Sequence, residues 1–235
     1  MKKAIIIKNV SKTNILNAIN LEIEHQEIIA IMGFSGSGKT TLLNLISGLD
    51  SPTTGTIEIN GTNLTKLKEP QLTKFRSQNI SYIFQDYKLI DYLTIKENIL
   101  ITQRINHQKI DNNKLDYLVK TLNLEQVKNL KINYLSGGQK QRVSIARALI
   151  GNNNFIFADE PTGALDLITR DQILKELINN VRHFQKTLII VTHDPYVAQY
   201  AGRIIFIADH QIESIHPQLQ LDDIEKKMKA LFKNV

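Results

Sequence analysis

The sequence contains no cysteine, so disulfide bonds and cysteine-ligated metal sites are excluded, which fits a reducing cytoplasm. No stretch approaches the roughly 18 apolar residues that a membrane-spanning helix requires, since apolar runs such as 188–191 and 204–208 are short. The formal net charge is +6, yet lysine and arginine are scattered rather than gathered into the dense basic run typical of nucleic-acid-binding surfaces. These absences predict a soluble protein with a solvated basic surface and no nucleic-acid partner.

The 235 residues, 42% of them apolar and 22% charged, have ordinary globular proportions and predict one domain spanning 1–235. The start, Met1-Lys2-Lys3, has the positive flank of a signal peptide. Its apolar run at 4–7 is shorter than the roughly 7 residues that a signal core requires. We therefore expect a first β-strand there.

Hydrophobic periodicity predicts a strand-rich front. Ile19, Leu21 and Ile23 alternate with polar residues, 28–32 is a continuous apolar run, and Ile57 and Ile59 alternate before an Asn-Gly turn. Residues 4–31 are therefore expected to be strands.

Later segments change to helical spacing. Within 104–133 a helical stripe predicts helix; its members are Leu115, Leu118, Val119 and Leu122. A strand at 155–158, a helix through Ile173 to Ile178 and a strand at 188–191 follow, and a terminal helix is expected after Pro217. That order predicts an α/β fold with a parallel sheet and crossover helices.

A phosphate-binding loop is predicted at 33–40, between the apolar strand 28–32 and a helical pattern. Its residues are Gly33, Phe34, Ser35, Gly36, Ser37, Gly38, Lys39 and Thr40, followed by Thr41. The glycines let backbone N–H groups turn toward phosphate, at the positive end of the next helix. Lys39 would meet the β/γ oxygens, and the Thr40 hydroxyl could hold Mg²⁺.

Two adjacent carboxylates, Asp159 and Glu160, end the apolar strand that begins at Phe155. Because neighbouring side chains on a strand point in opposite directions, we expect them to have different roles. Asp159 is placed to bind Mg²⁺ directly or through water, and Glu160 is the candidate that polarises an attacking water. The alternative is a capped strand end without chemistry.

A second glycine-containing helix start lies at Leu135-Ser136-Gly137-Gly138-Gln139, ahead of a helical segment expected at 141–150. One nucleotide cannot easily occupy both helix starts. Taken together, the two motifs resemble the nucleotide-binding domains of ABC transporters, over essentially the whole chain.

This resemblance implies a P-loop NTPase with a RecA-like parallel-sheet core, an N-terminal antiparallel β-subdomain and a helical subdomain at about 86–150. It implies ATP and Mg²⁺ as ligands. It also implies a homodimer in which each ATP lies between the phosphate loop of one subunit and the segment 135–139 of the other, called the signature turn below. Ser136 and Gly138 would then contact the γ-phosphate, with Gly137 and Gln139 in the same turn.

Three further positions match the family pattern. Gln85 resembles the loop glutamine that touches Mg²⁺ and faces the membrane subunit, and Asp166 ends the loop that crosses the dimer interface. His193 resembles the switch histidine that senses the γ-phosphate. Catalysis would then involve Glu160, His193 and Lys39, and the metal would be held by Thr40, Gln85 and Asp159. His25, His107, His183, His210 and His216 have no such context and receive no role.

Four segments have sequences similar to the MacB/LolD branch of this family, which includes Bce-type modules for antimicrobial-peptide resistance. They are DSPTTG at 50–55, FQDY at 84–87, LTIKEN at 93–98 and EPTG at 160–163. The resemblance implies a peripheral subunit on the inner face of the cell membrane, energising a separate permease for export or extraction of a peptide, lipoprotein or antimicrobial compound. A mechanical or signalling ATPase of the cell-division type is one alternative. A soluble nucleic-acid-associated ABC ATPase is another, but such proteins carry long insertions or two ATPase domains.

The sequence departs from the family pattern near its start. Residues 1–33 contain no Phe, Tyr or Trp, where the family usually carries an aromatic residue that stacks on adenine, and the equivalent positions are 13–15. Such stacking is worth about 1–3 kcal/mol. The preference for ATP over GTP is therefore expected to be weak or to be supplied in another way. Gln26 also stands where the family often has glycine, which is expected only to alter a turn.

Overall fold

The computed structural model describes residues 3–232, which form two compact units. Unit 1 comprises the described residues up to Arg76 and from Thr187 onward, and unit 2 comprises Ser77–Lys186. Met1 and Lys2, where a leader segment would begin, lie outside the described residues.

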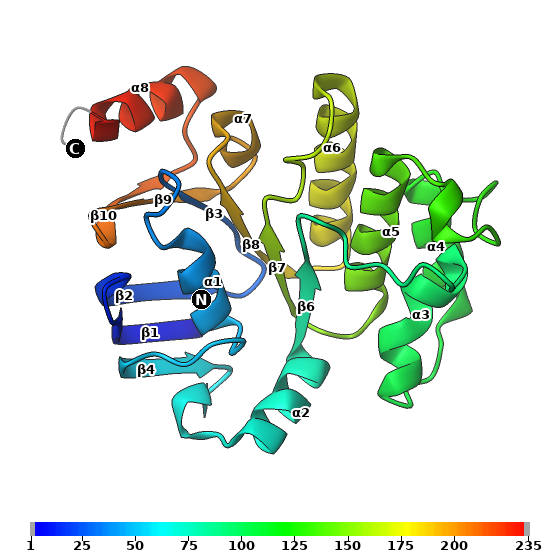
Figure 1. Ribbon diagram of the computed structural model, residues 1–235, viewed down its shortest axis with the longest axis horizontal. Helices are drawn as coiled ribbons and strands as arrows, with labels where there is room; N and C mark the ends of the chain where they lie inside the picture. The colour runs from blue at the N-terminus through cyan, green and yellow to red at the C-terminus, as the bar shows by residue number, and fades with distance from the viewer. Residues whose placement is uncertain (1–2, 233–235) are drawn as a thin grey trace. The chain divides into compact units, whose positions relative to one another are not determined.

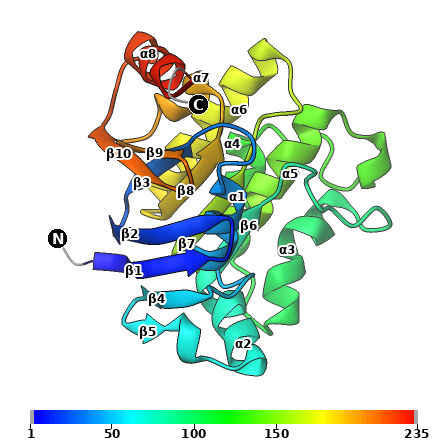
Figure 2. The same cartoon turned by 60° about the vertical axis from the view of Figure 1, so that its left-hand side comes forward.

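Unit 1 contains a four-stranded antiparallel sheet, in the order β2-β1-β4-β5. Its strands, visible edge to edge in Figure 2, are β1 (Lys3–Lys12), β2 (Leu16–Glu24), β4 (Thr54–Ile59) and β5 (Thr62–Asn63). Ile19, Leu21 and Ile23 are buried between more exposed neighbours, as their alternation predicts. This confirms the prediction that the N-terminal part of the chain is rich in strands.

Unit 1 also contains a group of mainly parallel strands: β3 (Ile28–Met32), β8 (Thr187–Thr192), β9 (Arg203–Ala208) and β10 (Gln211–Pro217). β3 pairs in parallel with both β8 and β9, and β10 pairs antiparallel with β9. Every residue of β3 and β8 is buried, which explains their continuous apolar sequences. Parallel strands end at the same edge, and that edge carries the loops described below.

The helices of unit 1 follow these strands. They are α1 (Lys39–Ile46), the short α7 (Pro195–Ala198) and the terminal α8 (Leu221–Phe232), with a 3₁₀ turn, η1 (Leu64–Lys66). α8 contacts α7 and buries Ile224, Met228 and Leu231, so the expected terminal helix is confirmed as a packed element (Figure 1). α2 (Glu69–Asn79) connects the sequence of unit 1 to that of unit 2.

Unit 2 combines two parallel strands with a group of helices. They are β6 (Ile80–Ile83), β7 (Phe155–Asp159), α3 (Ile95–Ile105), α4 (Asn112–Thr121), α5 (Gly137–Ile150), α6 (Leu167–His183) and the 3₁₀ turn η2 (Ile132–Tyr134). α5 contacts α3, α4 and α6 and is the common packing partner of this unit (Figure 1).

Two helix boundaries differ from the sequence prediction. The helix expected within 104–133 ends at Thr121, because Asn123 takes a left-handed conformation, φ 53°. The helix expected from Gln141 begins four residues earlier, at Gly137, because Ser136 and Gln139 form a capping box there. The signature glycines therefore lie in the first turn of α5.

Both units mix helices with parallel strands, and unit 1 adds an antiparallel sheet, so the predicted α/β class is confirmed. Among residues 3–232, no helix combines the length and apolar character that crossing a bilayer demands.

Candidate functional site

The glycine loop of unit 1 leaves β3 and enters α1 in a conformation that side chains would block. Gly36 and Gly38 have φ values of 82° and 95°, in the left-handed region that favours glycine. A Cβ at Gly33 would lie 2.4 Å from the Ile207 carbonyl oxygen, and one at Gly38 would lie 2.9 Å from the Ile15 carbonyl oxygen. The loop is therefore packed against both β9 and the β1–β2 turn.

Polar groups within this loop point inward. The Lys39 side chain is buried, and its ammonium donates a hydrogen bond to the Phe34 carbonyl oxygen at 2.6 Å. The Ser37 hydroxyl is buried and has no hydrogen-bond partner within the described part of the chain. The first turn of α1 contains no acidic residue, so its positive end is not neutralised by its own side chains. An anion with several oxygens matches these groups.

His193 lies at the same edge of unit 1 as the glycine loop. Met32, the last residue of β3, is the register partner of Thr192, the last residue of β8. Gly33 and His193 therefore leave two adjacent parallel strands at the same level. Asp194 accepts a hydrogen bond from the Tyr196 amide at 2.8 Å and caps α7, which fixes the chain just after the exposed His193.

In unit 2, the pairing register of two adjacent parallel strands likewise brings Gln85 and Glu160 together. Ile83 of β6 pairs with Ala158 of β7, and Gln85 and Glu160 each lie two positions after these paired residues. A Cβ at Gly163 would lie 3.6 Å from the Glu160 Cβ and 3.7 Å from the Gln85 Nε2, so all three residues converge. Asp159 ends β7 beside Tyr82, whose pKa is raised by burial and, secondarily, by the Asp159 charge.

The expectation that Asp159 and Glu160 alternate on one strand is wrong in detail. β7 ends at Asp159, and Glu160 has left the strand with φ 43°. The turn is closed by the Gly163 amide, which donates to the Glu160 carbonyl oxygen at 3.1 Å. Glu160 therefore lies in a backbone turn that follows the strand, and strand alternation does not relate its side chain to that of Asp159.

The predicted metal-binding residues supply a hydroxyl, an amide and a carboxylate oxygen, from Thr40, Gln85 and Asp159. These are hard donors of the kind Mg²⁺ prefers, and they leave coordination positions for water and phosphate. Residues 3–232 contain no cluster of three or more His, Cys, Asp or Glu able to hold a metal ion. The chemistry of these three donors matches Mg²⁺, and their joint role as a metal site stays a prediction, since Thr40 belongs to unit 1 and Gln85 and Asp159 belong to unit 2.

The signature turn begins α5 and is exposed at Ser136 and Gly137. The Ser136 hydroxyl accepts from the Gln139 amide at 3.3 Å, and the Gln139 side chain accepts from the Ser136 amide at 3.0 Å. A Cβ at Gly138 would lie 2.7 Å from the Thr169 Cγ2, so this glycine permits close contact between α5 and α6. Gly137 faces the Tyr87 hydroxyl, 3.3 Å from a Cβ at that position.

Asp166 caps α6 in this structure. Its carboxylate accepts a hydrogen bond from the Thr169 amide at 3.0 Å, which lowers its pKa. The following residues, Leu167 and Ile168, are apolar and 71% and 76% exposed. The loop expected to reach a second subunit therefore continues into an exposed apolar helix start.

Sequence reasoning missed two residues of α5 that hold the candidate site loops of unit 2. The Gln141 side chain is fully buried and donates to the Pro161 carbonyl oxygen, next to Glu160. The Arg147 guanidinium donates to the carbonyl oxygens of Tyr87 and Lys88 at 2.7 and 2.6 Å, just after Gln85. Burial lowers the pKa of Arg147. The only sequence signal was a polar residue in a helix that is otherwise largely buried.

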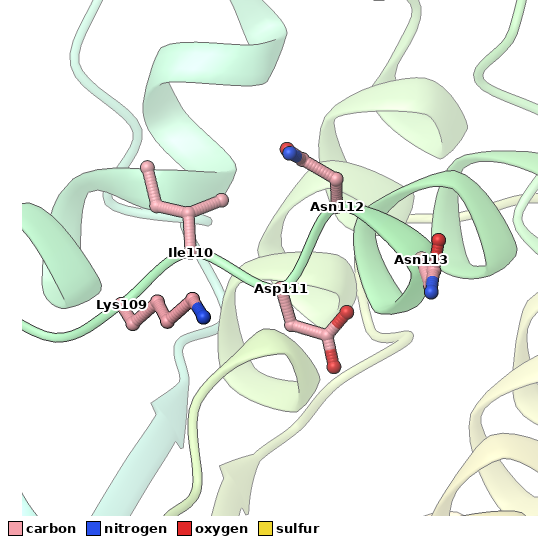
Figure 3. Close-up of a pocket in the computed structure, with 5 residues that line it drawn as sticks. All are labelled: Lys109, Ile110, Asp111, Asn112 and Asn113. Carbon is pink, nitrogen blue, oxygen red and sulfur yellow. The ribbon is translucent and has the colours of Figure 1, made fainter.

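A hollow of about 460 Å³ lies where the chain enters α4, lined by residues 109–113. Figure 3 shows that the five side chains point in different directions and do not converge on a common point. Asp111 is engaged as the α4 cap, accepting from the Lys114 amide at 3.1 Å. This hollow receives no functional role.

Comparison with known proteins gives consistent matches. A family model described as "ABC transporter" matches residues 16–163. The bacitracin export ATP-binding protein BceA of Halalkalibacterium halodurans is 41% identical over 96% of this chain and 88% of its own length. The lipoprotein-releasing system ATP-binding protein LolD of Leptospira interrogans is 37% identical over 95% of this chain and 93% of its own length. Among solved structures, the dimeric post-hydrolysis ATP-binding cassette MJ0796 with ADP and Pi has a TM-score of 0.82, at 38% identity over 92% of this chain and 99% of that chain.

Proposed function

Because the chain belongs to the ABC transporter family, whose chemistry is ATP hydrolysis, we propose that its predicted site residues bind and hydrolyse ATP and that the released energy drives a separate membrane permease. We further propose that residues 1–235 act as one ATPase domain, with about 86–150 as its helical subdomain.

The observation that carries this proposal is the inward-facing polarity of the glycine loop, above all the buried Ser37 hydroxyl without a partner in the described chain. A buried hydroxyl in that state is unfavourable, and a phosphate oxygen would satisfy it. The Lys39 ammonium would exchange the Phe34 carbonyl for the β/γ oxygens of ATP. The residues 33–41 would together form the triphosphate cradle.

Catalysis is assigned to the residues that follow the strand ends. Thr40, Gln85 and Asp159 would hold Mg²⁺, which neutralises the charge that develops on the phosphates. Glu160 would accept the proton of the attacking water, and His193 would sense the γ-phosphate. The convergence of Gln85 and Glu160 beside Gly163 supports these assignments.

We infer that two copies close around two nucleotides, since MJ0796 is described as dimeric both in the structure above and in a second one, which is 39% identical to this chain with a TM-score of 0.82. The exposed turn of Ser136, Gly137, Gly138 and Gln139 would meet the γ-phosphate held by the second copy, at the positive end of α5. Asp166, with the exposed Leu167 and Ile168, would lie against that copy.

The permease is expected to bind unit 2 near Gln85. Tyr92 and Tyr134 are 77% and 78% exposed, and Leu130 is 45% exposed. The segments that carry these residues run side by side, because Thr94 bridges Lys131 and the Ile95 amide donates to the Leu130 carbonyl oxygen at 3.0 Å. Exposed aromatic and aliphatic side chains in one place favour a protein partner.

The class of cargo is proposed from the relatives. Their names describe bacitracin export and lipoprotein release, and the MacB protein of Campylobacter jejuni, 39% identical over 96% of this chain and 36% of its own length, is named for macrolide export. We therefore expect export or extraction of a peptide, lipoprotein or antimicrobial compound by a complex that holds this chain on the inner face of the membrane.

The test is Glu160→Gln. ATP turnover should fall by about 10²–10⁴-fold, because a general base is lost. ATP binding should persist, and the protein should elute as a dimer when ATP is present. Glu125→Gln, at an exposed glutamate of the same unit, is the matched control and should keep full turnover. A Glu160→Gln protein that stays monomeric with saturating ATP would contradict the dimer, and unchanged turnover would contradict the catalytic assignment.

The partner is tested separately. Tagged protein is recovered from detergent-solubilised membranes, and the co-purifying proteins are identified by mass spectrometry. Tyr92→Ser combined with Tyr134→Ser should reduce recovery of a permease without reducing ATP binding. Recovery of no membrane protein, with or without ATP, would contradict the permease assignment.

A further inference from the structure

His210 occupies a backbone conformation that normally selects glycine. β9 and β10 are joined by a two-residue turn, since Ala208 pairs with Gln211. Both turn residues are left-handed, with φ values of 46° for Asp209 and 66° for His210. Such turns favour glycine at the second position, because other residues are strained there. A histidine therefore occupies a strained turn position where glycine would be unstrained, and strained residues of this kind point to a functional role.

The imidazole of His210 is held in a defined place. Its Nδ1 lies 2.9 Å from the Ile15 carbonyl oxygen, and the Asn17 amide donates to the His210 carbonyl oxygen at 2.8 Å. The β9–β10 turn is therefore tied to the β1–β2 turn by a side chain and by the backbone. His210 is nevertheless exposed, so its ring remains accessible to a ligand.

This ring lies next to the phosphate loop, within unit 1. The Ile15 carbonyl oxygen that contacts His210 is also the atom that approaches the Cβ position of Gly38 to 2.9 Å. β3 and β9 are parallel and end at the same edge, with Met32 opposite Phe206. The phosphate loop and the His210 turn consequently emerge side by side. In a nucleotide, the ribose alone separates the phosphates from the base. When the phosphates lie on this loop, the base is therefore one ribose away from the loop.

The β1–β2 turn itself offers the base no aromatic ring. It is tight, because Lys12 pairs with Leu16 and only residues 13–15 lie between them. Residues 1–33 contain no Phe, Tyr or Trp. Imidazole rings stack on nucleic-acid bases as other aromatic side chains do. His210 therefore supplies, from a distant part of the sequence, the kind of surface that this turn lacks.

We propose that His210 is a nucleotide-binding residue that stacks on the purine base, and that it gives this chain its preference for a nucleotide over a bare polyphosphate. The inference rests on the proposed function, since it requires ATP phosphates on the glycine loop. Its competitor is a purely structural role in which the bond from His210 to Ile15 only joins two turns.

Two variants separate these roles. His210→Gly relieves the turn and removes both ring and hydrogen bond. His210→Asn removes the ring but tolerates the left-handed conformation and keeps an amide that can donate to the Ile15 carbonyl oxygen. His107→Gly is the matched control, because His107 is also exposed and left-handed, with φ 51°, but belongs to unit 2. Thermal unfolding verifies that each variant is folded.

The measurement is calorimetric titration of ADP and of inorganic pyrophosphate, neither of which is turned over. We expect the ADP Kd to rise about 5-fold to 150-fold in both His210 variants, which corresponds to base stacking of about 1–3 kcal/mol. The pyrophosphate Kd should stay unchanged, and His107→Gly should bind both ligands as the parent protein does.

Three results would overturn the inference alone: unchanged ADP binding in His210→Gly, ADP binding retained by His210→Asn but lost by His210→Gly, or equal weakening for ADP and pyrophosphate. Failure of the parent protein to bind either ligand would instead overturn the proposed function, and the inference with it. The two failures are therefore distinguishable.

Discussion

Single residues in left-handed conformations occur in the candidate site loops of this protein. Glu160 has φ 43°, and Tyr87 and Lys88, which follow Gln85, have φ values of 63° and 45°. A left-handed conformation costs a non-glycine residue about 1–2 kcal/mol, so it persists only where surrounding contacts impose it. At Glu160 the strain turns the carboxylate out of the β7 pleat, and at Tyr87 and Lys88 it presents two carbonyl oxygens to Arg147.

Lys186 is a buried cation whose cost to stability should depend on pH. Its ammonium donates to the carbonyl oxygens of Gly151 and Asn153, at the end of α5. Burial, and then the charge of Lys114, lowers its pKa from 10.5 to about 8. Between pH 8 and 10.5 the folded lysine is mostly neutral while the unfolded one is still protonated. The unfolded state then binds more protons, so the free energy of unfolding rises with pH in this window.

We therefore predict that the stability difference between the parent protein and Lys186→Met changes with pH. In urea titrations, the free energy of unfolding of the parent protein should rise relative to that of the variant from pH 8 to 10. The slope should be up to about 1.4 kcal/mol per pH unit. Lys120→Met, at an exposed lysine, is the control, because it removes a lysine that is not buried. If the stability difference for Lys186→Met stays constant with pH, burial does not lower the pKa of Lys186.

At the scale of elements, α5 joins the signature turn to two other loops of the candidate site. Ser136 caps its start and Gly137 lies in its first turn. Its buried Gln141 donates to the Pro161 carbonyl oxygen, and Arg147, near its end, donates to the loop after Gln85. The Arg142–Glu176 ion pair, with contacts of 2.8 and 3.1 Å, attaches the same helix to α6. A displacement of α5 would therefore also displace the loop after Gln85 and the turn at Glu160.

Arg147→Ala should loosen the Gln85 loop without unfolding α5. The carbonyl oxygens of Tyr87 and Lys88 would lose charge-assisted donors, each bond being worth about 1.5–3 kcal/mol. Amide exchange at Tyr87 and Lys88 should accelerate at least about tenfold, measured by hydrogen–deuterium exchange. Arg147→Lys should give an intermediate rate because it can keep one donor. Arg142→Ala should leave these amides unchanged, and acceleration in that control would point to general loosening of α5 instead.

At the scale of the whole molecule, locally encoded features could be predicted and long-range ones could not. The loop 33–40, the alternation in β2 and the buried run of β3 depend on neighbouring residues, so the sequence indicated them directly. The Arg147 contacts with Tyr87 and Lys88 join residues 60 and 59 positions apart, and the bond from His210 to Ile15 joins residues 195 apart. Such pairs depend on chain topology, which periodicity does not specify. His210 received no role from the sequence for this reason.

The last prediction concerns how two copies share nucleotide. If the phosphate loop binds ATP within one chain and the signature turn contacts the ATP of the other, the two segments should respond differently to protein concentration. In Glu160→Gln with ATP, amides of 33–41 should exchange about tenfold more slowly at every protein concentration, because binding alone orders them. Amides of 136–139 should slow only at concentrations where the dimer is populated.

The concentration at which 136–139 become protected should match the midpoint of ATP-dependent dimerisation measured by light scattering. ADP should protect 33–41 but leave 136–139 unprotected, because it has no γ-phosphate for the signature turn to contact. Protection of 136–139 in a dilute, monomeric sample would show that the signature turn responds to the nucleotide of its own chain. The assignment of Ser136 and Gly138 to the ATP of a second copy would then have to be abandoned.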